Sequence, residues 1–196
     1  GTWDLFRYPG VRSDSDMFTL GYSFKLWQSD KSIAPGDSIR NYVKDTAKEN
    51  DIEKHIQFQH KLISSSWFSE EASWTLDVEQ SDGSIKKIRA NFVMGCAGYY
   101  NYDKAYTPEF KGAENVKGQV VHPQFWPDNF DYGDKKVVVI GSGATAVTLV
   151  PAMTDKAAHV TMLQRSPTYI ANMPSEDKLA NTLKRALPQK LAYAIT

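Results

Sequence analysis

Cysteine is almost absent from this sequence, with Cys96 as the only one among 196 residues. A single cysteine excludes an internal disulfide and a C-x-x-C redox pair, and it favours a reducing compartment, so we predict a cytoplasmic location. We expect Cys96 itself to be a small buried residue rather than a nucleophile. No apolar run approaches the roughly 20 residues that cross a bilayer, so no transmembrane segment is predicted.

Neither sign of charge dominates, because 23 Lys and Arg balance 23 Asp and Glu. No basic tract is present, which argues against nucleic acid as a partner and against an anionic membrane surface. Repeats and low-complexity segments are also missing, and we predict no metal site. The length allows one good core or two small ones. The chain starts at Gly1 rather than at a methionine and stops soon after a helical pattern, so we expect an internal segment of a longer protein.

The most informative stretch is an apolar run at residues 137–140, followed by G-x-G-x-x-A and by an apolar segment at residues 144–153. The run predicts a buried strand of a parallel sheet, and the segment after it predicts a helix. In that context the glycine pattern is typical of dinucleotide binding, since Gly141 permits a tight turn and Gly143 lets a pyrophosphate approach the backbone. The helix start then faces the phosphates. The predicted contacts are Gly141, Ser142, Gly143, Ala144, Thr145 and Ala146. The alternative is an ordinary strand-turn-helix with glycines for geometry alone.

The next predicted strand, residues 159–165, ends without an acid. An Asp or Glu at this point binds the ribose 2′-hydroxyl of NAD, whereas a basic residue suits the 2′-phosphate of NADP. Here Arg165 ends the predicted strand and Ser166 follows it, while Asp155 lies before it. We therefore predict that NADP is the cofactor and that Arg165 and Ser166 hold its 2′-phosphate. A solvated charge at a strand end is the alternative for Arg165.

Weaker patterns predict the other elements. Helical spacing at residues 39–47 follows a possible cap at Asp37 or Ser38, and a helix at residues 177–187 stops before Pro188. Three runs predict an antiparallel meander whose Trp and Phe side chains are core, with an Asp-Gly turn at residues 81–83. The runs are residues 61–68, 73–79 and 84–92. A short strand at residues 56–58 and a buried strand at residues 90–98 are also expected. Residues 101–134 are irregular and predict a domain boundary.

Four motifs, in this order, resemble those of type I Baeyer–Villiger monooxygenases, which belong with the flavin-containing monooxygenases. They are G-T-W at residues 1–3, R-Y-P-G-V-R-S-D at residues 7–14, G-C-A-G-Y-Y at residues 95–100 and the run at residues 118–127. The run resembles the family fingerprint F-x-G-x-x-x-H-x-x-x-W-[P/D], with Val116 in place of Phe. Its matching residues are Gly118, His122, Trp126 and Pro127. The second motif is closest to that of ethionamide-type monooxygenases.

The resemblance implies an α/β, Rossmann-like fold with two dinucleotide domains and an antiparallel β-meander. Residues 1–105 would be a partial FAD-binding domain that lacks its N-terminal G-x-G-x-x-G, residues 106–134 a hinge that carries the fingerprint, and residues 135–196 the first part of an NADP-binding domain. It also implies that the segment alone binds FAD poorly and is inactive.

The resemblance further implies roles for single residues. Asp14 would be the catalytic aspartate that faces FAD, and the other FAD-lining residues would be Thr2, Trp3, Arg12, Ser13 and Leu62. From the residues alone, the loop that holds Arg12 and Asp14 is either cofactor-lining or a site of local salt bridges. The fingerprint residues would couple domain rotation to cofactor exchange.

The implied activity uses NADPH and O₂ to insert one oxygen atom into a ketone, or to oxidise a thioether or an amine, through a C4a-peroxyflavin. One alternative is an N- or S-oxygenating enzyme without Baeyer–Villiger activity, and another is an inactive NADP-binding module. A flavin disulfide reductase would need a redox cysteine pair, which the sequence lacks.

Overall fold

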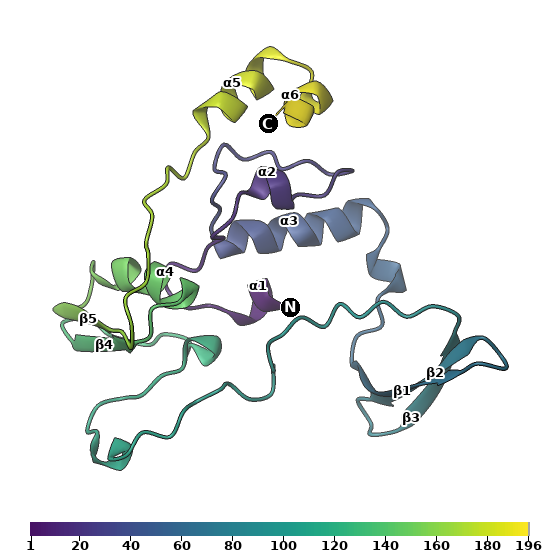
Figure 1. Cartoon of the computed structure of the whole chain (residues 1–196), viewed down its shortest axis with the longest axis horizontal. Coiled ribbons are helices and arrows are strands. Elements are labelled where there is room, and N and C mark those ends of the chain that lie inside the picture. Colours follow the sequence, from purple (N-terminus) through teal and green to yellow (C-terminus); the bar gives the residue numbers. More distant parts are fainter. Residues whose placement is uncertain (196) are drawn as a thin grey trace. The chain divides into compact units, whose positions relative to one another are not determined.

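A computed structural model describes residues 1–195, which form two compact units (Figure 1). The first unit comprises Gly1–Thr46 and Tyr100–Thr196, and the second comprises Ala47–Tyr99. The first unit holds the predicted glycine turn and the N-terminal loop, and the second holds the predicted meander. The FAD-domain, hinge and NADP-domain boundaries expected from the sequence stay a prediction.

A parallel strand pair forms where the glycine pattern predicted it. Strand β4 (Lys136–Ile140) pairs with β5 (His159–Leu163), with Lys136 opposite His159 and Ile140 opposite Leu163. Helix α4 (Ala144–Met153) connects the two strands and lies beside them in Figure 1. These three elements confirm the predicted strand, turn, helix and strand.

The prediction that residues 137–140 are a buried strand is wrong for one face of the sheet. Val139 is buried, whereas Val138 and Ile140 on β4 are each 60% exposed, and Leu163 on β5 is 54% exposed. Both faces of a strand are buried only when other layers cover both sides of the sheet. Within residues 1–195, a layer that includes α4 covers the face of Val139, and the face of Val138 and Ile140 stays open.

The first core of this unit gathers around α4. Met153 is 2% exposed and Leu149 is 3% exposed, and both pack with the aromatic rings of Phe6 and Tyr8 from the N-terminal segment. Burying a side chain such as Met153 stabilises the fold by roughly 1.5–3 kcal/mol. The N-terminal segment and α4 are therefore held together by a shared apolar core. Its other buried members are Tyr132, Val139 and Ala146.

A second core lies between four helices of the same unit, which are α2 (Met17–Leu20), α3 (Gly36–Glu49), α5 (Lys178–Ala186) and α6 (Gln189–Ile195). Its buried side chains are Met17, Phe18, Trp27, Ala34, Ile39 and Ala180. The predicted α3 and α5 are confirmed. The predicted cap of α3 is wrong, because that helix begins at Gly36 and already includes Asp37 and Ser38.

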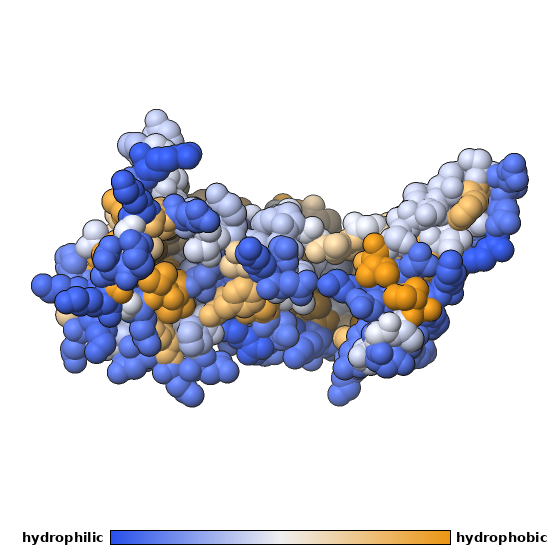
Figure 2. Space-filling view, turned by 90° about the horizontal axis from the view of Figure 1, so that it is seen from below, coloured by the Kyte–Doolittle hydropathy of each residue, from blue (hydrophilic) through white to orange (hydrophobic). Residues whose placement is uncertain are grey.

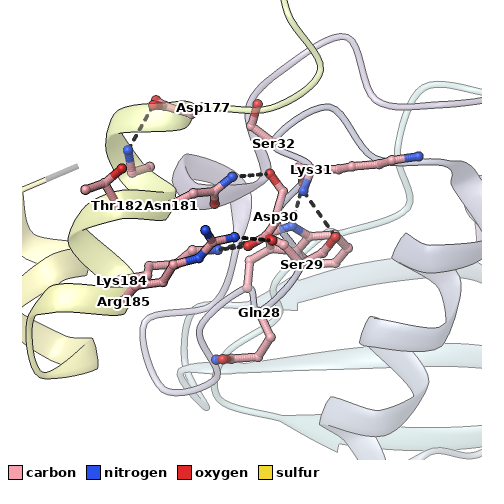
Figure 3. A network of polar contacts seen from close by, with 12 residues as sticks. Gln28, Ser29, Asp30, Lys31, Ser32, Asp177, Asn181, Thr182, Lys184 and Arg185 are labelled. Carbon is pink, nitrogen blue, oxygen red and sulfur yellow. Dashed lines mark hydrogen bonds and ion pairs between the residues drawn. The ribbon is translucent and has the colours of Figure 1, made fainter.

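The docking of α5 on the loop at residues 28–32 adds a polar network to this core (Figure 3). The Asn181 side-chain amide donates to the backbone carbonyl of Asp30 at 2.9 Å. The Asp30 carboxylate pairs with Lys184 at 3.5 Å and with Arg185 at 3.2 Å. Asp30 and Arg185 are exposed, and exposed ion pairs contribute only about 0–1 kcal/mol. Lys184 is more shielded, since its side chain is 15% exposed and its ammonium also donates to the Ser29 carbonyl at 3.0 Å.

The second unit is the antiparallel meander that the sequence predicted. Strand β1 (His60–Phe68) pairs with β2 (Ser73–Gln80), and β2 pairs with β3 (Ile85–Ala90). The Asp-Gly turn between β2 and β3 is confirmed, since Gly83 has φ +78° and its N–H donates to the carbonyl of Gln80 at 3.0 Å. Ser84 donates to the Asp82 carboxylate from both its N–H and its hydroxyl.

Two predicted strands of this unit do not form. Residues 56–58 follow the short 3₁₀ helix η1 (Glu53–His55), and residues 91–98 leave β3 as irregular chain. A strand is stable only when its backbone groups find a neighbouring ladder. Within residues 1–195 no strand pairs with either segment. Cys96 lies in the second of these segments and is exposed, so its predicted burial is wrong as well.

The prediction that the meander's aromatic side chains form a core is also wrong for most of them. Trp67 and Phe68 on β1 are exposed, and so is Phe92 after β3. A single three-stranded sheet has no second layer to cover these rings. Trp67 contacts the neighbouring ring of Trp74, with 5.4 Å between ring centroids, and its indole N–H donates to the Ser69 hydroxyl. The face of the molecule shown in Figure 2 is largely hydrophilic with separate hydrophobic patches.

The linker at residues 101–134 contains two single 3₁₀ turns, η2 (Ala113–Asn115) and η3 (Pro123–Phe125), and is otherwise irregular, as predicted. A short helix, α1 (Thr2–Leu5), begins the first unit. Among residues 1–195 no helix is long and apolar enough to cross a membrane, and the longest, α3, has 14 residues.

Candidate functional site

The glycine turn between β4 and α4 is open to a ligand. Gly143 precedes α4 as its N-cap, and a Cβ placed on it would meet no atom within 4 Å. The first hydrogen bond of the helix runs from the Val147 N–H to the Gly143 carbonyl at 3.0 Å. The N–H groups of the three preceding residues, 144–146, therefore have no acceptor inside the helix. An anionic group can reach these three donors and the positive end of the helix dipole.

The segment after β5 lies at the same edge of the sheet. The Gly141 N–H donates to the Leu163 carbonyl at 2.9 Å, so the glycine turn and the end of β5 are adjacent. The hydroxyls of Ser142 and Thr168 are hydrogen-bonded at 2.7 Å, which ties the later chain to the turn. Arg165 lies between these points and is exposed. Within residues 1–195, no hydrogen bond or ion pair engages its guanidinium.

The structure thus brings together the two groups of residues that the sequence assigned to NADP. The glycine turn and its helix start supply neutral donors, and Arg165 with the exposed Ser166 follows the adjacent strand. The carboxyl ends of parallel strands meet at one edge, and that edge is where dinucleotides bind in folds of this class. The assignment of NADP contacts to these residues stays a prediction.

The loop predicted to line FAD has one buried side chain, Ser13, between two exposed ones, Arg12 and Asp14. Ser13 is buried, and its hydroxyl accepts from the Ala34 N–H at 3.0 Å. Its own N–H donates to the Ala34 carbonyl at 2.9 Å. Arg12 and Asp14 on either side are exposed. Ser13 therefore anchors the loop, while the two charged side chains are exposed, and the Asp14 carboxylate accepts from the Ser15 hydroxyl at 3.5 Å.

Trp3 lines a cavity of about 360 Å³ in the first unit. Arg7 and Arg40 also line this cavity, and both pair with the carboxylate of Asp4, at 3.3 Å and 4.0 Å. Thr2, next to Trp3, is hydrogen-bonded through its hydroxyl to Tyr102 at 3.4 Å. Sequence reasoning missed Arg40, because it lies on α3, far along the chain from the G-T-W motif, and carries no motif of its own.

Leu62 lies on β1 in the second unit, opposite Val78, and is 50% exposed. Its predicted contact with FAD stays a prediction.

The fingerprint residues of the linker have structural contacts of their own. His122 Nδ1 accepts from the Gln124 N–H at 3.1 Å and caps η3. Trp126 packs edge-on against Phe130 and Tyr132, and it joins the core around α4. Gly118 and Pro127 are exposed. The predicted hinge role of these residues stays a prediction.

Comparison with known proteins decides the family. The sequence pattern of flavin-binding monooxygenase-like proteins matches residues 17–185. The chain belongs to this family. Among its relatives is the FAD-containing monooxygenase EthA of Mycolicibacterium smegmatis, which is 56% identical over 196 residues. The probable FAD-binding monooxygenase AlmA of Acinetobacter baylyi is 51% identical over 197 residues. Both matches cover 100% of this chain and 40% of the relative, so the chain spans about two fifths of their length.

Solved structures agree with the family. An oxidised steroid monooxygenase bound to NADP superposes with a TM-score of 0.78 at 28% identity, over 100% of this chain and 36% of that protein. The expected α/β fold of the flavin monooxygenases, with Rossmann-like dinucleotide-binding architecture and an antiparallel meander, is thereby confirmed. The resemblance to this family drawn from the four motifs is confirmed as well.

Proposed function

We propose that this chain is part of an FAD-containing, NADPH- and O₂-dependent monooxygenase that inserts one oxygen atom into a ketone. The observation that carries the proposal is the open start of α4 beside Arg165, in a chain of the flavin-binding monooxygenase-like family. FAD as a cofactor is supported by the relatives EthA, an FAD-containing monooxygenase, and AlmA, a probable FAD-binding monooxygenase. NADP is supported by the similar fold of the steroid monooxygenase bound to NADP.

In this proposal the first unit binds NADPH. The N–H groups of Ala144, Thr145 and Ala146 hold the pyrophosphate, and Gly143 leaves room for it. Arg165 holds the 2′-phosphate through charge-assisted hydrogen bonds. When bound, NADPH supplies a hydride and FAD supplies the oxygen-transfer chemistry, while the protein orients both and excludes water.

Asp14 has a positioning role on the FAD side. Its carboxylate is exposed at the end of a loop that Ser13 anchors. An exposed carboxylate at a fixed position orients a cationic partner, and the family resemblance places that partner, an arginine, outside these 196 residues. Such a cation stabilises the negative charge that develops on a ketone oxygen during oxygen insertion.

The alternative function is oxygenation of sulfur or nitrogen without Baeyer–Villiger activity. Val116 at the first fingerprint position, where the Baeyer–Villiger pattern has Phe, favours this alternative. The spacing of His122 and Trp126 favours ketone insertion. We further propose that the 196-residue chain alone binds NADP without turnover, because it contains no second glycine pattern for the FAD pyrophosphate.

Product analysis of the full-length protein separates the two functions. Purified enzyme is supplied with NADPH, O₂ and either a cyclic ketone or a thioether, and the products are identified by mass spectrometry. We expect the lactone from the ketone. Sulfoxide from the thioether without any lactone would reject ketone insertion and support the alternative.

Titration calorimetry with NADP and NAD tests the cofactor assignment. We expect NADP to bind more tightly, and Arg165→Ala to weaken NADP by about tenfold, the lower end of the range for a charge-assisted hydrogen bond because Arg165 is exposed. NAD binding should not change. Arg185→Ala removes an exposed arginine from α5 and serves as the control. Equal affinity of the parent protein for NADP and NAD would contradict the assignment.

A further inference from the structure

The turn at residues 8–11 makes a close contact with α4 that only glycine permits. The Val11 N–H donates to the Tyr8 carbonyl at 3.3 Å, and Gly10 has φ +80°. A Cβ on Gly10 would lie 2.5 Å from the Thr148 carbonyl oxygen and 2.6 Å from the Ala152 Cβ. Both distances are too short for non-bonded atoms, and the first involves rigid helix backbone. Any larger residue at this position must push the turn away from α4.

A buried polar contact lies next to this close approach. Tyr8 is 6% exposed, and its hydroxyl accepts from the Thr148 hydroxyl at 3.3 Å. The Thr148 hydroxyl also lies within hydrogen-bond distance of the carbonyls of Ala144, at 3.1 Å, and Thr145, at 3.0 Å. Thr148 is itself buried and lies one helical turn after Ala144, where α4 begins. A buried hydrogen bond between two side chains fixes their relative position more strictly than apolar packing does. The turn is therefore held on α4 by shape and by a directional bond.

The other side of the same loop is fixed to the start of α3. The Gly36 N–H donates to the Val11 carbonyl at 2.9 Å, and the Ser13 N–H donates to the Ala34 carbonyl at 2.9 Å. Only three residues separate Gly10 from Asp14. With hydrogen bonds at both Val11 and Ser13, this short connection has little freedom to absorb a movement of α4.

We infer that Tyr8, Gly10 and Thr148 are positioning residues that fix Asp14 relative to the dinucleotide turn at the start of α4. The inference rests on the proposed function, which gives Asp14 and α4 their roles. A ligand that orders the start of α4 then also orders the Asp14 loop, and by linkage the loop contributes to ligand affinity. The benefit is geometric, because reacting groups must be held within a fraction of an ångström of their productive positions.

Hydrogen exchange measured by mass spectrometry tests this coupling without any turnover. The full-length protein is compared with and without 2′-phospho-ADP-ribose, which carries the pyrophosphate and lacks the nicotinamide. In the parent protein we expect slower exchange at residues 144–147 and also at residues 11–14. In Gly10→Ala we expect the protection at residues 144–147 to remain and the protection at residues 11–14 to disappear. Ligand affinity should fall by about fivefold, the lower end of typical coupling between sites.

Gly83→Ala is the matched control. Gly83 also has a left-handed backbone, with φ +78°, but no atom lies within 4 Å of its added Cβ. This variant carries the same backbone strain as Gly10→Ala without the collision against α4. It should lower thermal stability and keep both protected regions. Tyr8→Phe, which removes only the buried hydroxyl, should weaken the protection at residues 11–14 in a protein that folds like the parent.

The outcomes are distinct. Protection at residues 144–147 alone in the parent protein would overturn the inference and leave the NADP assignment standing. Protection of both regions in Gly10→Ala would also overturn it, and so would undiminished protection at residues 11–14 in Tyr8→Phe where Gly10→Ala does not fold. Absence of protection at both regions in the parent would reject the NADP assignment together with the inference.

Discussion

Trp126→Ala separates a structural role of the fingerprint tryptophan from a purely catalytic one. Trp126 is half-buried, and its ring centroid lies 5.3 Å from that of Phe130 and 6.2 Å from that of Tyr132, both in edge-on geometry. The same side chain packs against the core around α4. Removing it therefore detaches the end of the linker from that core.

The expected loss of unfolding free energy in Trp126→Ala follows from these contacts. Truncation of a fully buried Trp to Ala destabilises a protein by about 3–5 kcal/mol. Trp126 is only half-buried, so we expect roughly 2–3 kcal/mol, which includes about 0.5–1.5 kcal/mol for each of the two ring pairs. In a domain of this size each kcal/mol lowers Tm by about 2–4 °C, so the expected fall is about 4–12 °C.

The assay is thermal unfolding followed by tyrosine and tryptophan fluorescence, checked by urea denaturation. Trp126→Phe keeps a ring in place and should lose less than half as much stability as Trp126→Ala. Phe125→Ala is the control, because Phe125 is the exposed neighbour on η3 and should cost about 0.5 kcal/mol or less. If Trp126→Ala is as stable as Phe125→Ala, the ring cluster does not hold the linker and the structural reading of the fingerprint is refuted.

Further predictions concern the contacts of α5 and α6. Asp30→Asn removes the ion pairs of Asp30 with the exposed Arg185 and with Lys184, whose side chain is 15% exposed. It should lower the unfolding free energy by about 1 kcal/mol or less, a difference that shrinks in roughly 1 M salt on thermal melts. Asn181→Ala removes a hydrogen bond to the Asp30 backbone and should cost about 1 kcal/mol at low and high salt alike. Burial raises the pKa of Tyr193 above its ordinary value, so folding favours the neutral hydroxyl. The contribution of Tyr193 to the unfolding free energy is complete at pH values below the ordinary tyrosine pKa, and it is lost as the pH rises through the raised pKa. Ultraviolet titration of the parent protein and of Tyr193→Phe measures this shift in pKa.

Elements that depend on local patterns could be predicted from the sequence. The bounds of α4 agree with the apolar segment after the glycine turn, and Asp177 caps α5 by accepting from the Ala180 N–H at 2.9 Å. The Asp-Gly turn at Gly83 also forms as its residue types require. In each case the deciding interactions lie within a few residues along the chain.

Features that depend on distant partners could not be predicted. A strand was predicted at residues 90–98, yet beyond Ala90, which ends β3, the segment pairs with no strand among the described residues. Nothing local indicated that the turn at residues 8–11 would rest on α4, where Tyr8 and its partner Thr148 are 140 residues apart in sequence. In the candidate site, the family resemblance implied that Ser13 lines FAD, and only the fold shows that its hydroxyl accepts from the Ala34 backbone N–H.

One face of the β4–β5 sheet exposes the aliphatic side chains of Val138, Ile140 and Leu163, and this exposure affects how the purified chain behaves. Within residues 1–195, β4 and β5 are both edge strands. On one side of each strand, the backbone N–H and C=O groups pair with no other strand. Exposed apolar side chains on an unpaired edge strand favour pairing with a strand of another molecule. Purified alone at high concentration, the 196-residue polypeptide should therefore self-associate through β4 and β5 before any other part of it does.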